Sequence, residues 1–273
     1  MNDNEIISQG YENYTPEEHE TWRILFNRQA EMLPGRAAPE FVDGLEALGV
    51  EANGIPDFEK LSDRLEAKTG WRIVAVRGLI DDDVFFGLLA DRRFPVTHWI
   101  RKRAQLDYLQ EPDCFHDCFG HVPMLFNPVF ADYMAAYGRG GLKALKHDAL
   151  TYLARLYWYT VEFGLIDTPD GLRIYGAGIV SSKGESLYAL DDPAPNRLEF
   201  DLMRIMQTDY IIDHFQQTYF VIDSYDQLFR ATRPDFVPYY RQLKTLPELA
   251  ADAVRDTDRR IEIDRKAQGG AKK

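Results

Sequence analysis

Residues 108–125 read "YLQEPDCFHDCFGHVPML", and they place two histidines, His116 and His121, in a segment apolar enough to be core. Residues five apart on an ideal α-helix point roughly 140° apart, so an ordinary helix would not bring both imidazoles to one point. Gly120 permits an unusual backbone, and Pro123 disfavours helical geometry in the residue before it. We therefore expect the helix to end at His121, where an irregular last turn can bring the two imidazoles together.

Each histidine also has an aspartate about one turn before it, Asp113 and Asp117, so both histidines could simply form local ion pairs on a helix face. Glu162 indicates a different interpretation. It lies in "LYWYTVEFGL", which is typical of a buried helix, and its helical neighbours include no Lys or Arg. A buried carboxylate without a counter-charge is costly. The counter-charge must come from elsewhere in the fold, either as a metal ion or as a distant arginine.

Two histidines and one carboxylate form the ligand set of non-haem Fe(II) oxygenases, which leaves coordination positions open for oxygen and for substrates. Zinc accepts the same ligands, so a metallohydrolase is an alternative at this point. The two cysteines, Cys114 and Cys118, are a weaker alternative set. Thiolates favour zinc or iron–sulfur clusters, but with two cysteines in the chain a zinc cluster would also need both histidines.

The composition limits the classes of partner. The 273 residues, 45% of them hydrophobic, are enough for one full core, and we expect a single domain. The net charge of −12 gives no reason to hold a polyanion, which argues against nucleic acid and anionic membranes. The apolar runs are shorter than the ~20 residues that span a bilayer. Because the two cysteines are close in sequence and no secretory leader precedes them, we expect a cytoplasmic protein.

Helical patterns dominate the chain, and strands are few and short. Thr15, followed by Pro16 and acidic residues, is typical of a helix start. Helices are predicted over 16–33, 39–49 and 55–70 and, as one long buried helix, over 145–165; strands are predicted over 71–76 and 94–100 and on both sides of a turn at 169–171. We predict a mainly α fold (α+β with a few short strands), with one domain over 16–262 and flexible tails over 1–15 and 263–273.

Three motifs, "EPDCFHDCFGHVP", "LYWYTVEFGL" and "YGAGIVSSKGE", follow one another in an order that resembles the catalytic domain of the pterin-dependent aromatic amino acid hydroxylases. Through "YLQEPD" and "NPVFADYMAAYG" the chain is most similar to the short bacterial phenylalanine 4-hydroxylases. The resemblance covers about residues 16–238. It implies a monooxygenase of phenylalanine catabolism that converts L-phenylalanine and O2 to L-tyrosine, with Fe(II) and tetrahydrobiopterin or another tetrahydropterin as cofactors.

The resemblance also implies roles for individual residues. His116, His121 and Glu162 match the catalytic iron ligands. The positions that match the substrate site are Arg101, Trp158, Phe163, Gly178, Ser181 and Ser182. The positions that match the pterin site are Phe85, Gly87, Leu88 and Glu111, with Phe86 as the competing choice for the stacking ring. From composition alone, Arg101 would instead be an exposed helix arginine, and the aromatic residues would be ordinary core.

Three functions remain open at this stage. The first is the phenylalanine hydroxylase, and the second is a tryptophan or tyrosine hydroxylase of the same fold. Val221, where an apolar residue in the family accompanies phenylalanine use, favours the first. The third is a non-catalytic metal-binding helical protein. Because the chain has no room for the regulatory domain and the tetramerising helix of animal members, we expect a monomer.

Overall fold

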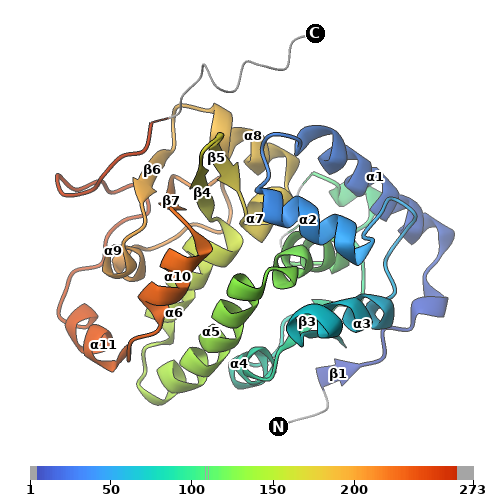
Figure 1. Cartoon of the computed structure of the whole chain (residues 1–273), viewed down its shortest axis with the longest axis horizontal. Helices are drawn as coiled ribbons and strands as arrows, with labels where there is room; N and C mark the ends of the chain where they lie inside the picture. The colour runs from blue at the N-terminus through green and yellow to red at the C-terminus, as the bar shows by residue number, and fades with distance from the viewer. Residues whose placement is uncertain (1–4, 108, 110, 263–273) are drawn as a thin grey trace.

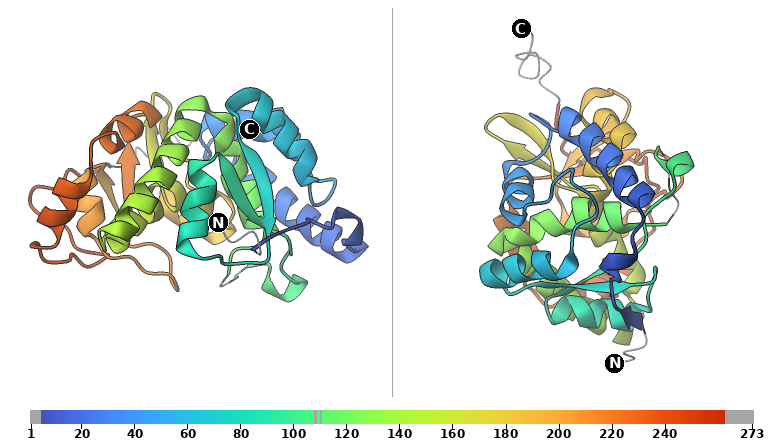
Figure 2. Two further views of the ribbon diagram at one scale, coloured as in Figure 1. Left: turned by 90° about the horizontal axis from the view of Figure 1, so that it is seen from below. Right: turned by 90° about the vertical axis from the view of Figure 1, so that its right-hand side faces the viewer.

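The computed structural model describes residues 5–107, 109 and 111–262. Helices form most of the molecule, and two small sheets lie on opposite sides of a long helix, α5 (Pro128–Lys146), which crosses the middle of the molecule (Figure 1). The view from below shows the same arrangement (Figure 2, left). The predicted mainly α fold with a few short strands is therefore confirmed.

The first sheet has three strands in the order β1 (Ile6–Ile7), β2 (Arg72–Val76) and β3 (Arg93–Thr97). Strand β2 pairs with β1 in the antiparallel sense and with β3 in the parallel sense. Helix α4 (Asp82–Ala90) connects the two parallel strands, as a parallel pair requires. The strands predicted over 71–76 and 94–100 are both present. The second begins one residue before its predicted start and ends at Thr97, three residues before its predicted end.

The predicted N-terminal tail differs from the structure over the residues that are described. Strand β1 pairs with β2, and the side chain of Gln9 donates to the carbonyl of Pro56 at 2.8 Å and accepts from the backbone N–H of Phe58 at 2.8 Å. Residues 5–15 are thus fastened to the domain by long-range contacts that the polar composition did not indicate. The tail predicted over 263–273 lies outside the described residues.

The second sheet has four strands in the order β5 (Gly171–Ile174), β4 (Leu165–Thr168), β7 (Thr218–Ile222) and β6 (Asn196–Glu199). The hairpin of β4 and β5 has its turn where it was predicted, and Gly171 supplies the positive φ of 98° that the turn requires. Strand β7 lies between two parallel neighbours, and all of its residues are buried. This is the usual environment of an apolar central strand.

The three N-terminal helices follow their predicted signals. Helix α1 (Pro16–Met32) begins with a capping box between Thr15 and Glu18, while α2 (Pro39–Leu48) and α3 (Phe58–Thr69) each end at a left-handed glycine. The other helices are α6 (Leu150–Tyr157), α7 (Ala177–Val180), α8 (Lys183–Asp191), α9 (Leu202–Gln207), α10 (Tyr225–Thr232) and α11 (Val237–Leu243), with short 3₁₀ turns η2 (Tyr11–Asn13), η3 (Arg103–Gln105) and η5 (Val122–Phe126).

The long helix predicted over 145–165 is wrong in its first part. Helix α5 ends at Lys146, and the chain turns at Asp148, which has a positive φ of 49°, before α6 begins at Leu150. Aspartate tolerates this left-handed conformation better than most residues. The second part is a buried helix as predicted, and it ends in a π turn, η6 (Trp158–Glu162).

The residues after α11 return to the second sheet. The backbone N–H of Ile261 donates to the carbonyl of Arg197 at 2.8 Å, and the backbone N–H of Glu199 donates to the carbonyl of Arg259 at 2.9 Å. Beneath this segment, the guanidinium of Arg204 is 1% exposed and lies 3.2 Å from the carboxylate of Asp258. A buried guanidinium needs such partners, so this ion pair fastens the segment to α9.

Helix α5 packs closely on α4 because it has glycine at the contact. A Cβ added to Gly138 would lie 2.3 Å from the backbone nitrogen of Ala90, whereas one added to Gly140 would meet its nearest atom at 4.0 Å. We expect Gly138→Ala to destabilise the protein by about 1–3 kcal/mol through overpacking. The matched variant Gly140→Ala should stabilise it by up to about 1 kcal/mol, because alanine favours a helix more than glycine does.

The measurement is the midpoint and slope of urea unfolding for the two variants and the wild type. Equal midpoints for Gly138→Ala and Gly140→Ala would contradict the close packing of α5 on α4.

Candidate metal centre

His116 and His121 mark the ends of a single π turn, η4 (His116–His121). Here the backbone bonds run from residue i+5 to residue i, as in the bond from the Val122 N–H to the Asp117 carbonyl. Residues five apart are therefore one turn apart, and both imidazoles point to the same side. The predicted convergence is correct, and the π turn ends at His121, where the helix was predicted to end. The predicted irregular last turn is a regular, widened π turn that continues into the 3₁₀ turn beginning at Val122.

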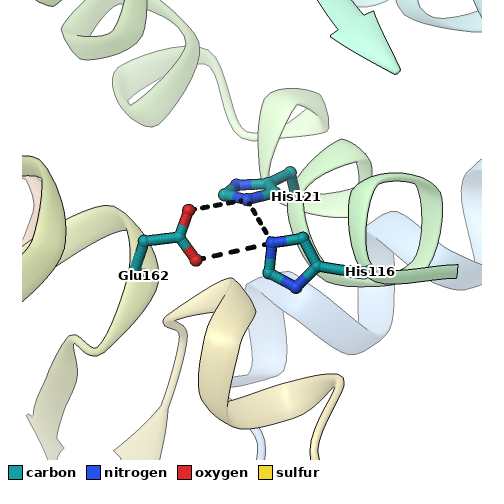
Figure 3. Close-up of side chains that lie close together, drawn as sticks. All are labelled: His116, His121 and Glu162. Carbon is teal, nitrogen blue, oxygen red and sulfur yellow. Dashed lines mark hydrogen bonds and ion pairs between the residues drawn. The ribbon is translucent and has the colours of Figure 1, made fainter. Parts of the chain in front are cut away.

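Glu162 ends the second π turn, η6, in which the N–H of Phe163 donates to the carbonyl of Trp158 at 2.8 Å. The wider turn changes the partners of the carbonyls before it. The hydroxyl of Thr160 donates to the carbonyl of Leu156 at 2.5 Å and lies 3.1 Å from the hydroxyl of Tyr133 on α5. The two π turns face each other, so that the three side chains converge (Figure 3).

The distances at the centre are those of a ligand set. The Nε2 atom of His121 lies 3.0 Å from Oε1 of Glu162, and the Nε2 atom of His116 lies 3.5 Å from Oε2. The two Nε2 atoms are 3.1 Å apart. Ligand atoms about 2.1 Å from one metal ion lie about 3.0 Å apart at right angles and about 3.4 Å apart in a tetrahedron. The side chains therefore fit a single ion, and the spacing alone does not choose the metal.

In residues 5–107, 109 and 111–262, these three side chains form the one group of at least three His, Cys, Asp or Glu residues whose ligand atoms converge in this way. The two cysteines do not belong to it. Cys114 and Cys118 are free and buried, and burial raises the pKa of the Cys114 thiol well above its usual value. The alternative of a cysteine-containing cluster is therefore wrong for the described part of the chain.

The hydrogen bonds of His116 fix its tautomer. The hydroxyl of Ser181 donates to the carbonyl of Ala177 at 2.7 Å, so it accepts from Nδ1 of His116 at 3.0 Å. This leaves the lone pair of Nε2 directed at the centre. Burial lowers the pKa of His116 to about 4, although the charge of Glu162 opposes it, so the imidazole is neutral near pH 7.

Glu162 and His121 form the charged part of the centre. Burial alone would raise the pKa of the Glu162 carboxyl, but the imidazoles of His121 and His116 and the N–H of Gly178 bring it below its ordinary value. Burial likewise lowers the pKa of His121, but the Glu162 carboxylate raises it above the ordinary value. The carboxylate is therefore ionised, and it favours the protonated form of the His121 imidazole.

The aspartates do not form the local ion pairs that were the alternative for this stretch. Asp113 is fully buried and accepts two side-chain bonds from Arg101, both at 2.9 Å, together with the backbone N–H groups of Arg101 and His116. Burial alone would raise the pKa of the Asp113 carboxyl, but the bonds and charge of Arg101 lower it. Asp117 accepts the backbone N–H of Thr97 at 2.7 Å.

Arg101 is 9% exposed, so the view of it as an exposed helix arginine is wrong. It lines a cleft of about 1100 Å³ that also contains His116 and Glu162. Most other residues predicted for substrate or pterin lie on the wall of the same cleft. They are Trp158, Phe163, Gly178, Ser181, Ser182 and Glu111.

Three of the predicted pterin positions are not on that wall. Phe85 is half-buried and forms a T-shaped ring pair with Tyr157, while Phe86 is buried against Gly141. Gly87 and Leu88 are buried inside α4, where their carbonyls accept from the N–H of Asp91. The structure therefore leaves Phe85 as the more accessible ring of the pair, and the backbone of Gly87 and Leu88 is occupied by the helix.

Sequence reasoning missed two residues of the centre. The sequence predicts Asp113 only as a partner of His116, whereas its main partner, Arg101, lies twelve positions earlier. Gln216 lines the cleft and contacts Trp158 from a loop that carried no motif. In both cases the contact depends on the tertiary structure, and no local pattern indicates it.

Within the described ranges, none of the helices has the length and apolar character that crossing a membrane requires.

Comparisons with known proteins place the chain in a family. Residues 7–250 match the model of the biopterin-dependent aromatic amino acid hydroxylases. The phenylalanine-4-hydroxylases of Ralstonia nicotianae and Chromobacterium violaceum are 63% and 65% identical to it, over 92% and 87% of this chain and 80% of each relative. A crystal structure of the Chromobacterium violaceum enzyme with iron and phenylalanine bound has a TM-score of 0.92 at 58% identity and covers 96% of this chain and 95% of its own.

The geometry predicts one metal site per chain. We expect metal-depleted protein to take up one Fe(II) or Co(II) ion, and we expect His121→Ala and Glu162→Gln to weaken this binding by more than about 100-fold, since even changes around a ligand typically cost 10–100-fold. His147→Ala, at an exposed histidine after α5, is the control and should bind like the wild type. Equilibrium dialysis measures the affinities; unchanged binding in both ligand variants would exclude this centre.

Proposed function

The chain belongs to the biopterin-dependent aromatic amino acid hydroxylase family, and we propose that it is a phenylalanine 4-monooxygenase. It hydroxylates L-phenylalanine to L-tyrosine with O2 and a tetrahydropterin at a non-haem Fe(II) site. The observation that carries the proposal is the set of two Nε2 atoms and one carboxylate at the bottom of a cleft large enough for an amino acid and a pterin. The identity to relatives named phenylalanine-4-hydroxylase supports the substrate.

In this proposal His116, His121 and Glu162 hold the iron and are the catalytic residues. When bound, the iron and a tetrahydropterin such as tetrahydrobiopterin supply the activation of O2 that ring hydroxylation needs. The protein holds its ligands in position beforehand. Ser181 orients the imidazole of His116, and the N–H of Gly178 faces the Glu162 carboxylate, so neither ligand must reorganise when the ion enters.

Arg101 binds the carboxylate of the amino acid. Asp113 accepts from its Nε and Nη2 atoms, which leaves further N–H donors of the guanidinium for a ligand. Both carboxylate oxygens of the buried Asp113 already hold the guanidinium. The guanidinium therefore loses little conformational freedom when the substrate binds. The proposal places the amino acid backbone near Ser181 and Ser182, and its ring beside Trp158 and Phe163.

The pterin is proposed to bind between Glu111, on the wall of the cleft, and Phe85, which lies outside that wall. Phe85 offers a half-buried ring, and Glu111 lies on the wall of the cleft. Gly87 and Leu88 are left out of this proposal because helix α4 encloses them. We further propose that the protein works as a monomer and that it lies in the cytoplasm. Its two unpaired buried cysteines agree with the reducing conditions of that compartment.

The direct test is tyrosine formation from L-phenylalanine with Fe(II), a tetrahydropterin and air. We expect product that depends on both cofactors and falls to background in His121→Ala and Glu162→Ala, because each variant removes a ligand. L-tryptophan and L-tyrosine are tested in parallel, and Val221 leads us to expect much slower turnover of both. Absence of product from every substrate, with iron bound, would leave the family fold without this activity.

Arg101→Lys tests the grip on the substrate. A lysine cannot make the paired contacts of a guanidinium, so we expect the KM for L-phenylalanine to rise by about 10–100-fold, with a smaller change in kcat. Arg103→Lys, at an exposed arginine in η3, is the matched control and should keep the wild-type KM. Steady-state kinetics with the pterin saturating gives both constants. An unchanged KM in Arg101→Lys would remove this residue from the substrate site.

A further inference from the structure

Gln216 occupies an unusual position at the wall of the cleft. It is 3% exposed, although it belongs to the loop of residues 209–217, whose tip is exposed at Ile212 and Phe215. Both ends of its amide are used. The Oε1 atom accepts the indole N–H of Trp158 at 2.8 Å, and the Nε2 atom donates to the carbonyl of Ile211 at 2.9 Å.

These partners allow one orientation of the amide. The indole N–H is only a donor and the carbonyl of Ile211 is only an acceptor, so a flipped amide would lose both bonds. The backbone of Gln216 is fixed as well, because its N–H donates at 3.0 Å to Glu185, a buried carboxylate in α8 that also accepts the hydroxyl of Tyr219. Gln216 is thus held by α8 and in turn holds Trp158.

Trp158 connects this hydrogen bond to the metal ligand. Its ring stacks on Tyr210 at 4.4 Å and packs against Phe163 at 4.8 Å, while its carbonyl accepts the N–H that closes the π turn ending in Glu162. Stacking resists tilting of the indole, but it leaves the ring free to slide in its own plane. The bond to Gln216 removes that freedom.

We infer that Gln216 is a positioning residue: it fixes the indole of Trp158 at the cleft wall and so sets how accurately the aromatic ring of the substrate is held. The inference rests on the proposed function, and it adds a residue that acts through Trp158 without touching the reacting atoms. Its amide also closes the loop from Ile211 to Gln216, which keeps Tyr210 on the outer face of the indole.

The test compares Gln216→Met, Trp158→Phe and the double variant with Gln217→Met, a substitution at the neighbouring exposed glutamine. We expect Gln216→Met to raise the KM for L-phenylalanine and to lower the tyrosine formed per tetrahydropterin oxidised. The ratio of this yield to the KM should fall by about tenfold, as expected for a misplaced substrate. Trp158→Phe should act similarly. The effects should not add in the double variant, because both changes break one bond. Gln217→Met should match the wild type.

A second readout does not need turnover. In the iron-loaded protein, the near-UV circular dichroism of the stacked Trp158 and Tyr210 should change in Gln216→Met and in Trp158→Phe, but not in Gln217→Met. Gln216→Asn, which stays polar but is one methylene too short for the indole, serves if the methionine variant does not fold. It should reproduce the same loss.

The outcomes separate the two proposals. If the wild type forms no tyrosine, the proposed function fails, while the dichroism still tests the bond. If the wild type is active and Gln216→Met and Gln216→Asn keep its KM and its yield of tyrosine per pterin, the inference is overturned. Additive effects in the double variant would also overturn it, since Gln216 would then act independently of Trp158.

Discussion

The packing of the partly buried Glu162 carboxylate against two imidazoles is the interaction on which the rest of this structure depends. An ionised carboxylate in the interior is costly unless a cation and hydrogen bonds compensate for it. Here the compensation is arranged by two π turns that direct Glu162, His116 and His121 to one point. A metal ion bound at that point would supply the positive charge that the carboxylate needs, so binding of the ion and stability of the fold are linked.

Asp113 joins two parts of the cleft that have different tasks. Its carboxylate holds the guanidinium of Arg101 and accepts the backbone N–H of His116, so one fully buried side chain fixes both the proposed substrate anchor and a proposed iron ligand. The distance between them cannot change without breaking charged, buried hydrogen bonds, which are among the strongest in proteins. The cleft is therefore rigid where the amino acid is expected to lie, and Gln216 extends this rigidity to the aromatic wall.

Local signals predicted much of this molecule. Helix caps and terminal glycines predicted the first three helices. The Glu162 carboxylate, in an apolar helix with no Lys or Arg neighbour, indicated a cation site. Features that depend on distant residues were not predictable in this way. The hydroxyl of Thr160, within the π turn that ends at Glu162, lies 3.1 Å from the hydroxyl of Tyr133 on α5. The pairing of Arg101 with Asp113 joins side chains twelve positions apart in the sequence. The order of residues 5–15 likewise comes from contacts with β2 and α3.

The π turn from His116 to His121 has a consequence for how the segment can vary over evolution. It accommodates one residue more than an α-helical turn would, so a deletion between the histidines would restore ordinary α-helical bonding and leave them four apart. The two histidines would then lie four apart on one face of an α-helix, so the wider turn lets residues five apart converge as residues four apart do in an α-helix. Lineages of this protein can therefore change the number of residues between the histidines only together with the type of turn, because a spacing of five needs a π turn and a spacing of four needs an α-helical turn.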